Sequence, residues 1–456
     1  MKRSEGYNIP QFISKGQLMR YLTLVTSVLA ALIAMPAATA ANLSEIHELA
    51  RANDAQYSIA VQTAAATREK SAQGRALLLP TVGITGNARE NSDQSSSYSG
   101  TRSYASSNAA FTASQPLLRL ANLATYEQGK LQSQLADQQL KLAEQDLYVR
   151  VARGYFEVLR ARDALATLGN QKEAFATQLA QARRNVEVGL SPVTDENEAQ
   201  SRYDLTVAQE IAARNDLEFK RRVLERLIAR ELPPLASLEA GVNIDILSSE
   251  QLLVLYGAAS QKALQVKIGM LNEKIARIEV DKQRAGHSPT VDLALNLGRS
   301  TNANFGALGG QQSHTRTSSI GIEVALPLYQ GGGINSRVRE AMANVGRAQS
   351  ETENARRQAT LDARQALQGV DSGLALEKAL RQAVNSGEAS VRSIQRGLLV
   401  GLRTRVDLLN AQQQLYTTLR DLSAARYQAL ISGVLLKAAA GDLGEQDLKT
   451  LDALLK

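Results

Sequence analysis

Few residues in this sequence are of the types that carry out chemistry, and they are not spaced as a catalytic set. The 456 residues include no Cys and three His, which are His47, His287 and His314. Without Cys the chain has no disulfide, no thiolate metal site and no Cys nucleophile. The three His are too scattered to form a cluster of metal ligands. We therefore expect a protein that is not an enzyme and holds no cofactor or metal.

A glycine run at residues 331–333 is the segment most similar to a phosphate-binding loop. It follows an expected strand and precedes an expected helix. It has neither the Gly-x-Gly-x-x-Gly pattern nor the Gly-Lys-Ser/Thr pattern that holds phosphates. We assign it to a tight strand-to-helix turn, with Leu118-Arg119 as the counterpart in the first half of the chain.

The charged residues favour solvated helices over a nucleic-acid interface. The chain has 52 Lys and Arg against 45 Asp and Glu, a formal net charge of +7. A nucleic-acid binder concentrates basic residues beside stacking aromatic residues, whereas here Arg alternates with acidic residues. Only 4% of the residues are aromatic, and Ala, Leu, Gln, Glu and Arg predominate. This composition predicts long helices and no nucleic-acid partner.

Residues 1–40 have the pattern of a secretory signal peptide. A basic segment precedes the apolar run 22–33, and the small residues 38–40 end in an Ala-x-Ala cleavage site. We expect export and cleavage after this site, with translation starting at Met1 or Met19. No later segment has 18 uninterrupted apolar residues, so we expect no transmembrane helix in the mature chain.

Three short sequences recur in the same order about 210 residues apart, two of them identically and one with Tyr329 in place of Leu118. The pairs are Pro80-Thr81-Val82 with Pro289-Thr290-Val291, Pro116-Leu117-Leu118 with Pro327-Leu328-Tyr329, and Val188-Gly189-Leu190 with Val400-Gly401-Leu402. They predict an internal duplication, with a first repeat at 41–240 and a second at 241–456. Each repeat is expected to contain a helix, a β-hairpin and long helices joined by a tight glycine turn. The expected hairpins are 78–118 and 289–328, the long helices are 119–230 and 334–440, and a C-terminal segment follows.

The predicted hairpins alternate in polarity. In the second hairpin, apolar residues occupy every second position in two stretches: Val291, Leu293, Leu295, Leu297, and Ile320, Ile322, Val324, Leu326. Each stretch is about ten residues long, the length that a tilted strand needs to cross a bilayer. We expect polar loops at 299–317 and, in the first hairpin, at 92–107. Alternation alone fits an amphipathic hairpin on a soluble core equally well.

The long helices favour the membrane interpretation. Residues 119–187 contain no Pro, and a helix of that length is about 100 Å long. Seven-residue spacing of apolar residues, as in Val151, Val158 and Leu165, predicts coiled-coil packing. Two hairpins supply only four strands, which cannot close a barrel. Three copies would supply twelve strands, and the same symmetry would wrap the helices into a tunnel. The predicted fold class is therefore a mixed α/β membrane protein that forms a trimeric barrel on a coiled-coil tunnel.

Nine segments also match a known family. They are Leu78-Leu79-Pro80, Ser114-Gln115-Pro116-Leu117, residues 152–159, Val188-Gly189-Leu190 with Thr194-Asp195, His287-Ser288-Pro289-Thr290, residues 326–332, Val400-Gly401-Leu402-Arg403-Thr404, residues 406–409 and residues 444–448. Through these segments the sequence resembles the TolC family of trimeric outer membrane channels over nearly all of the mature chain. The resemblance implies an exit duct in the outer membrane lipid, served by a periplasmic adaptor and an inner membrane pump.

The resemblance also implies a gate at the periplasmic tip. Arg403 matches a latch position on the inner hairpin, and Thr194 and Asp195 match its partners on the outer hairpin. Asp407 matches a ring of acids that constricts the pore, although an acid at this place also suits the first turn of a helix. The second acidic ring position is Asn410 here, so we expect a weaker electrostatic constriction. A latch tyrosine of the family corresponds to Leu398, so that hydroxyl contact is missing.

Two alternatives remain open from the sequence. The duct could serve type I protein secretion with an ATP-driven ABC exporter, or multidrug efflux with a proton-driven pump. The absence of an N-terminal lipid-anchored Cys, together with residues 444–448, favours the secretion-type and multipurpose members. The alternative from another class is a trimeric adhesive coiled coil on a barrel anchor, which does not account for two hairpins between long helices.

Overall fold

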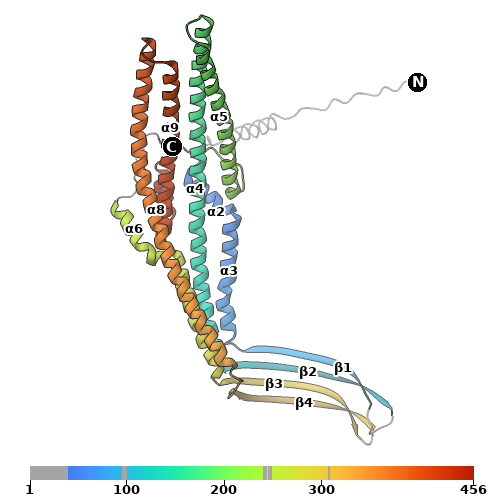
Figure 1. Ribbon diagram of the computed structural model, residues 1–456. Coiled ribbons are helices and arrows are strands. Elements are labelled where there is room, and N and C mark those ends of the chain that lie inside the picture. Colours follow the sequence, from blue (N-terminus) through green and yellow to red (C-terminus); the bar gives the residue numbers. More distant parts are fainter. Residues whose placement is uncertain (1–39, 95–99, 240–243, 245–248, 307–308) are drawn as a thin grey trace, which may run out of the picture.

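The computed structural model describes residues 40–94, 100–239, 244, 249–306 and 309–456. The predicted signal peptide, apart from Ala40, lies outside these residues. The described chain consists of a long body of helices and a four-stranded sheet that projects from one end of it (Figure 1). Among the described residues, no helix is both long and apolar enough to span a bilayer.

Each half of the chain has two helices, two strands, a very long helix and a shorter helix. The first half contains α2 (Leu43–Asn53), α3 (Ala55–Ala76), β1 (Thr81–Gln94), β2 (Thr101–Leu118), α4 (Leu120–Glu187) and α5 (Val193–Ile228). The second contains α6 (Ser249–Lys262), α7 (Leu264–Arg284), the 3-10 turn η1 (Ala285–His287), β3 (Thr290–Gly306), β4 (Gly309–Ala325), α8 (Gly333–Leu399) and α9 (Arg405–Ala440). The helix α10 (Glu445–Asp452) ends the chain. α4 and α8 have 68 and 67 residues, and α5 and α9 have 36 each.

The helices α3 and α4 pack with their backbones in contact, which glycine makes possible. A Cβ atom on Gly129 of α4 would lie 2.4 Å from the carbonyl oxygen of Lys70 on α3. Gly74 on α3 faces the backbone of Tyr126 on α4 in the same way, at 2.9 Å. Real Cβ atoms do not approach backbone atoms this closely, so these two glycines set the distance between α3 and α4.

The four strands pair in the order β1-β2-β3-β4, and every pair is antiparallel. The expected bounds of the polar loops, 299–317 and 92–107, are wrong, because the strands extend into both segments, further than the alternation predicts. Thr301 pairs with His314 and Asn302 with Ser313, inside the expected loop of the second hairpin. Backbone hydrogen bonds continue the ladder whether or not the side chains alternate in polarity, so polar residues do not mark where a strand ends.

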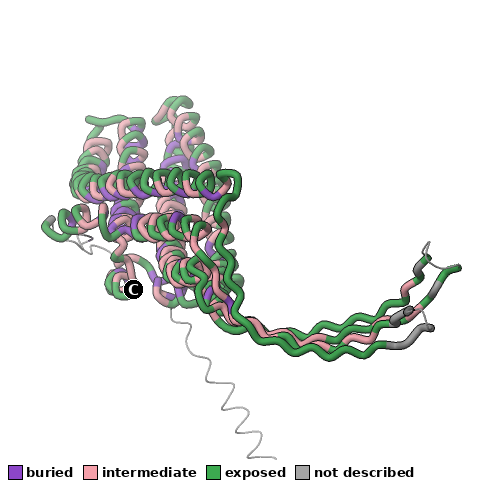
Figure 2. The backbone as a smooth tube through the Cα atoms, turned by 90° about the horizontal axis from the view of Figure 1, so that it is seen from below, coloured by how far each residue is buried: buried purple, intermediate pink, exposed green. Residues whose placement is uncertain are grey.

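The register gives the sheet one apolar face and one polar face. Val82, Ala113, Leu295 and Ile320 form one row across all four strands, and Ile84, Phe111 and Leu297 lie in the next row. The opposite face carries rows such as Gly83, Thr112, Asn296 and Ser319. Ile84, Ile320 and Ile322 are 80%, 73% and 66% exposed, and no helix covers the projecting sheet (Figure 2).

The largest core lies halfway along the helices, where the start, middle and end of the chain meet. Ala41 forms a parallel bridge with Leu235, and Leu238 forms an antiparallel bridge with Leu455. The Tyr155 hydroxyl of α4 lies 3.1 Å from the carbonyl oxygen of Ala41 and 2.9 Å from that of Ala236, so its one proton is shared between these two acceptors. Burial is the main cause of the raised pKa of Tyr155. We call this region the equatorial core.

Candidate functional site

The candidate site is the tip where the hairpins α4–α5 and α8–α9 turn, at the end of the body far from the sheet (Figure 1). Both turns are Schellman motifs, in which the two residues after the helix bond back to its last turn. Leu190 N–H donates to the Asn185 carbonyl at 2.7 Å, and Leu402 N–H donates to the Gly397 carbonyl at 2.8 Å. The motif needs a left-handed residue after the helix, and Gly189 and Gly401 have φ of 72° and 73° there.

The residues flanking these glycines are apolar and face solvent in the single chain. Val188 and Leu190 are 66% and 77% exposed, and Leu399 and Leu402 are 87% and 81% exposed. A Schellman motif commonly packs its apolar residue against its own helix. Here the motif instead leaves an apolar surface on each hairpin tip, which is the usual property of a contact site for another protein.

The predicted prolines all lie at the end of the sheet that adjoins the helices. Pro80 and Pro289 lie immediately before β1 and β3, and Pro327 lies just after β4. Pro116 lies in β2, next to an irregularity in its pairing with β3. Proline cannot donate a ladder hydrogen bond, so it suits strand ends and bulges. The glycine run 331–333 forms the turn into α8, with φ of 60° at Gly331 and 79° at Gly332.

Asp407 caps its own helix. Its backbone N–H donates to Thr404 Oγ1 at 3.1 Å, and its carboxylate accepts from the Thr404 backbone N–H at 3.0 Å. These two bonds form a capping box at the start of α9. The backbone bond from Thr404, the Thr404 hydroxyl bond and the charge of Arg403 lower the pKa of Asp407. The carboxylate is therefore ionised at neutral pH and held in one orientation.

The predicted latch residues are not joined to one another within the chain. Arg403 and Thr194 are exposed and Asp195 is half-buried. Asp195 donates its backbone N–H to Pro192 at 3.1 Å and so lies in the first turn of α5. Arg403 folds back over α8, since a Cβ atom at Gly397 would lie 2.8 Å from its Cγ. Leu398 lies in the last turn of α8, one residue before Leu399.

Asn410 makes a direct contact between the hairpins α4–α5 and α8–α9, which sequence reasoning missed. Its Oδ1 accepts from Arg202 Nη2 of α5 at 3.1 Å. Arg202 is oriented by Glu198 one turn earlier, with Nε–Oε1 of 2.8 Å. The Glu198–Arg202 spacing of four residues is visible in the sequence as a helix pair. The contact of Arg202 with Asn410 on α9 is not visible in the sequence, because it depends on how α5 and α9 pack.

Below the turns, α9 packs into the groove between α4 and α5. Phe175, Leu179, Ala182, Ala199 and Leu409 form a small buried cluster that joins the three helices. Gln171 Nε2 on α4 donates to Gln413 Oε1 on α9 at 2.9 Å. We call this contact region the α9 seam. Lys172 binds Glu210 at 2.5 Å and is the main cause of the lowered pKa of Glu210, which ties α4 to α5.

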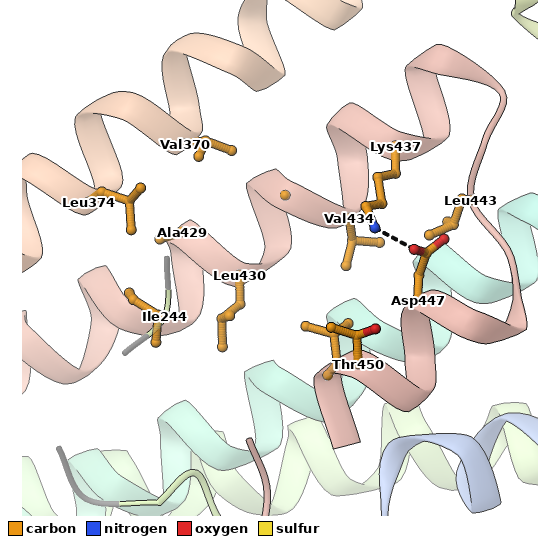
Figure 3. Close-up of a pocket in the computed structure, with 12 residues that line it drawn as sticks. Ile244, Val370, Leu374, Ala429, Leu430, Val434, Lys437, Leu443, Asp447 and Thr450 are labelled. Carbon is orange, nitrogen blue, oxygen red and sulfur yellow. Dashed lines mark hydrogen bonds and ion pairs between the residues drawn. The ribbon is translucent and has the colours of Figure 1, made fainter. Parts of the chain in front are cut away.

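An apolar pocket in the equatorial core is too small to bind a ligand (Figure 3). It has a volume of about 40 Å³, and Val370, Leu374 and Leu430 are among its lining residues. That volume is room for about one or two water molecules. Lys437 of α9 and Asp447 of α10 form an ion pair at its side. Within the described residues, no group of three or more His, Cys, Asp or Glu could hold a metal ion.

Asp447 belongs to residues 444–448, a segment that resembles the known family and has a structural role here. Asp447 accepts from the Gly444 backbone N–H at 2.9 Å and so caps α10, and Leu448 is completely buried in the equatorial core. This segment therefore fixes the end of the chain and lies far from the tip.

Comparison with known proteins decides the family. The sequence profile of the family "Outer membrane efflux protein" matches residues 46–230 and 255–442. The chain belongs to the outer membrane efflux protein family. It is therefore an outer membrane protein, and it acts as an exit duct in efflux or secretion.

Individual relatives agree with this assignment. The chain is 32% identical to "Outer membrane protein TolC" of Vibrio cholerae over 421 residues, 91% of this chain and 94% of the relative. It is 31% identical to "Proteases secretion protein PrtF" of Dickeya chrysanthemi over 451 residues, 96% and 95% of the two chains. Its fold is similar to the crystal structure of the outer membrane protein VceC from Vibrio cholerae, with a TM-score of 0.74 and 17% identity over 88% of this chain and 96% of that one. The predicted family, location and duct function are confirmed.

Proposed function

We propose that three copies of the chain form a barrel of twelve strands that continues into a helical tunnel. Each copy would contribute its four-stranded sheet, and β1 of one copy would pair with β4 of the next. The observation that carries the proposal is the uncovered sheet with one apolar and one polar face. The apolar rows extend over seven residues, from Val291 to Leu297, about 20 Å along a strand. An apolar stretch of this length on a tilted strand fits within the lipid-facing band of an outer membrane barrel, which is about 25 Å tall, and closure removes the two unpaired edges.

The two halves of the chain support its origin by duplication. Their long helices differ by one residue in length, their shorter helices are equal, and the family profile matches each half separately. A duplicated chain in a trimer gives six similar hairpins around the tunnel. Three of these, formed by α8–α9, would carry Arg403, Asp407 and Asn410, and the other three, formed by α4–α5, would carry Thr194 and Asp195.

We further propose that the tip is the gate. In a ring of three copies, Arg403 would reach Thr194 and Asp195 across a subunit contact, since within one chain it bonds to neither. Arginine can donate two bonds at once to a carboxylate and a hydroxyl. Each exposed contact contributes about 0–1 kcal/mol, and threefold repetition multiplies this energy. The ring of Asp407 side chains, weakened by Asn410 at the second position, would then favour cations at the entrance.

A periplasmic adaptor would open this gate by docking on the exposed apolar tips, and an inner membrane pump would supply the cargo. The similarity to a protein named for protease secretion favours type I secretion with an ATP-driven exporter. The similarity to TolC and the family name keep multidrug efflux as the second candidate. Family membership weighs against the adhesive coiled-coil alternative.

Single-channel conductance in a planar bilayer tests the duct and the gate together. We expect a small, steady conductance for the wild type and a severalfold increase for Arg403→Ala, because one latch contact per subunit is lost. Equal conductance would leave the duct standing and remove Arg403 from the gate. Correct trimers that conduct in neither form would contradict the duct itself.

A further inference from the structure

One positive charge in the α9 seam has no partner. Arg405 is the first residue of α9 and is 8% exposed. Its Nε and Nη1 are buried and make no hydrogen bond. Within the described chain it also forms no ion pair, whereas the other buried charged residues, Asp54, Asp292 and Glu377, each form one.

The helix register places Arg405 inside the groove between α4 and α5. Leu409 lies one turn further along α9 on the same face and is completely buried against Phe175 and its neighbours. Gln413 lies another turn along and accepts from Gln171 of α4. The guanidinium of Arg405 therefore lies above an apolar cluster, at the end of the seam that is closest to the tip.

A potential partner lies at the same height on α4 and is also unsatisfied. Gln178 is seven residues nearer the tip than Gln171, and Arg405 is eight residues nearer the tip than Gln413. Because α4 and α9 run in opposite directions, these steps bring Gln178 and Arg405 level. Gln178 is 8% exposed, and its Oε1 accepts no hydrogen bond. The acids nearest to this height on α5, Glu196 and Glu198, are already bound by Arg183 and Arg202.

Two effects make this arrangement unfavourable while α9 is docked. A buried cation loses its hydration and regains nothing when its N–H groups stay unpaired. In addition, the first turn of a helix has a partial positive charge, which repels a cation. Asp407 offsets the helix charge, but its carboxylate is occupied by Thr404. Water that reaches the guanidinium removes the first penalty and screens the second.

We propose that Arg405 biases the α9 seam towards opening, so that the docked tip is held close to its release point. The inference rests on the proposed gate and adds a residue and a direction to it. Arg403 and Asn410 would hold the inner hairpin in place, and Arg405 would oppose them. An adaptor then has to supply only part of the energy that separates α9 from α4 and α5.

Three variants of the full-length trimer test the proposal by hydrogen exchange. Arg405→Met keeps the length of the side chain and removes the charge. Gln178→Glu instead gives the guanidinium a carboxylate at its own height. In both we expect amide exchange over residues 405–413 to slow at least tenfold, about 1.4 kcal/mol, and the open-channel fraction to fall. The control Arg396→Met changes an exposed arginine in the last turn of α8 and should change neither readout.

The outcomes separate this inference from the proposed function. Faster exchange or a more open channel in Arg405→Met would overturn the inference, because the guanidinium would then be holding the seam closed. An unchanged exchange rate would overturn it as well. If Arg405→Met does not assemble, Gln178→Glu decides by the same criterion. Slowed exchange in trimers that never conduct would support the bias in the seam while contradicting the duct.

Discussion

Substitutions at the contact between Arg202 and Asn410 should change the stability of the closed tip in either direction. The contact joins α5 to α9 through one hydrogen bond of 3.1 Å. Arg202→Ala removes the donor. Asn410→Asp keeps the geometry and converts the acceptor into a carboxylate, so that the same contact becomes an ion pair. We expect the first variant to loosen the tip and the second to tighten it.

The structure sets the size of the effect. A hydrogen bond between a charged donor and a neutral acceptor contributes about 1.5 kcal/mol when buried. The Arg202 side chain is 29% exposed, so we reduce this to about 0.5–1 kcal/mol. If the three seams of a trimer open together, the total is about 1.5–3 kcal/mol, which is about a tenfold to 150-fold change in the ratio of closed to open channels.

Single-channel recording measures that ratio directly, and the double variant provides the control. In Arg202→Ala with Asn410→Asp, the carboxylate has lost its partner, so the tightening should disappear. A more open channel in Asn410→Asp alone would refute the reasoning, because repulsion within a ring of acids would then outweigh the contact with Arg202. If the effects of the two substitutions simply add in the double variant, the reasoning is refuted as well.

The remaining predictions concern assembly and the helical body. Deletion of residues 289–327 should abolish stable trimers on a denaturing gel, because half of each sheet is removed; surviving trimers would contradict the shared barrel. Asp54 accepts two bonds from Arg150 at 2.9 and 3.0 Å and caps α3, and these bonds lower its pKa despite the opposing effect of burial. A lowered folded-state pKa stabilises the fold above the unfolded value of about 4, so this contribution to the free energy of unfolding should be lost as the pH falls below about 4. Thermal melting of Asp54→Asn at a series of pH values should lack this acid-dependent loss of stability. If the variant keeps the wild-type pH profile, Asp54 is not its source. Gly129→Ala should destabilise the packing of α3 on α4 by about 1–3 kcal/mol, seen as faster amide exchange in α3, whereas wild-type exchange rates would mean that the Lys70 backbone can move aside.

The sequence contains the information for those parts of the fold that depend on local rules. α4 begins at Leu120, one residue after the predicted start. It continues to Glu187 because residues 119–187 contain no Pro to interrupt a helix. Val188-Gly189-Leu190 and Val400-Gly401-Leu402 form the same turn twice, because a Schellman motif needs one left-handed residue and glycine adopts it without strain. Strand positions followed from the period of two, while strand ends did not, since the ladder continues through polar pairs such as Thr301 and His314.

The candidate site was only partly predictable, because its contacts join helices that are distant in sequence. The first-turn position of Asp407 could be inferred from Thr404 three residues earlier, which is a capping-box spacing. The contact of Asn410 with Arg202 spans 208 residues, and no local pattern records it. Arg405 is the clearest case: in the sequence it is one more arginine in an exposed-looking turn, and only the docking of α9 against α4 and α5 buries it.

The distribution of packing explains why movement would be confined to the tip. The equatorial core contains 28 buried hydrophobic residues, drawn from the start, middle and end of the chain, while the α9 seam has a cluster of five. Hydrophobic burial contributes about 1.5–3 kcal/mol for each large side chain, so the equatorial core resists separation much more strongly. The seam adds isolated polar contacts, two unsatisfied glutamine oxygens on α4, at Gln171 and Gln178, and the unpaired Arg405. Segments with few apolar contacts open before the global fold does. An adaptor that pulls on the α8–α9 turn would therefore separate α9 from α4 and α5 first, while the equatorial core keeps the rest of the duct in place.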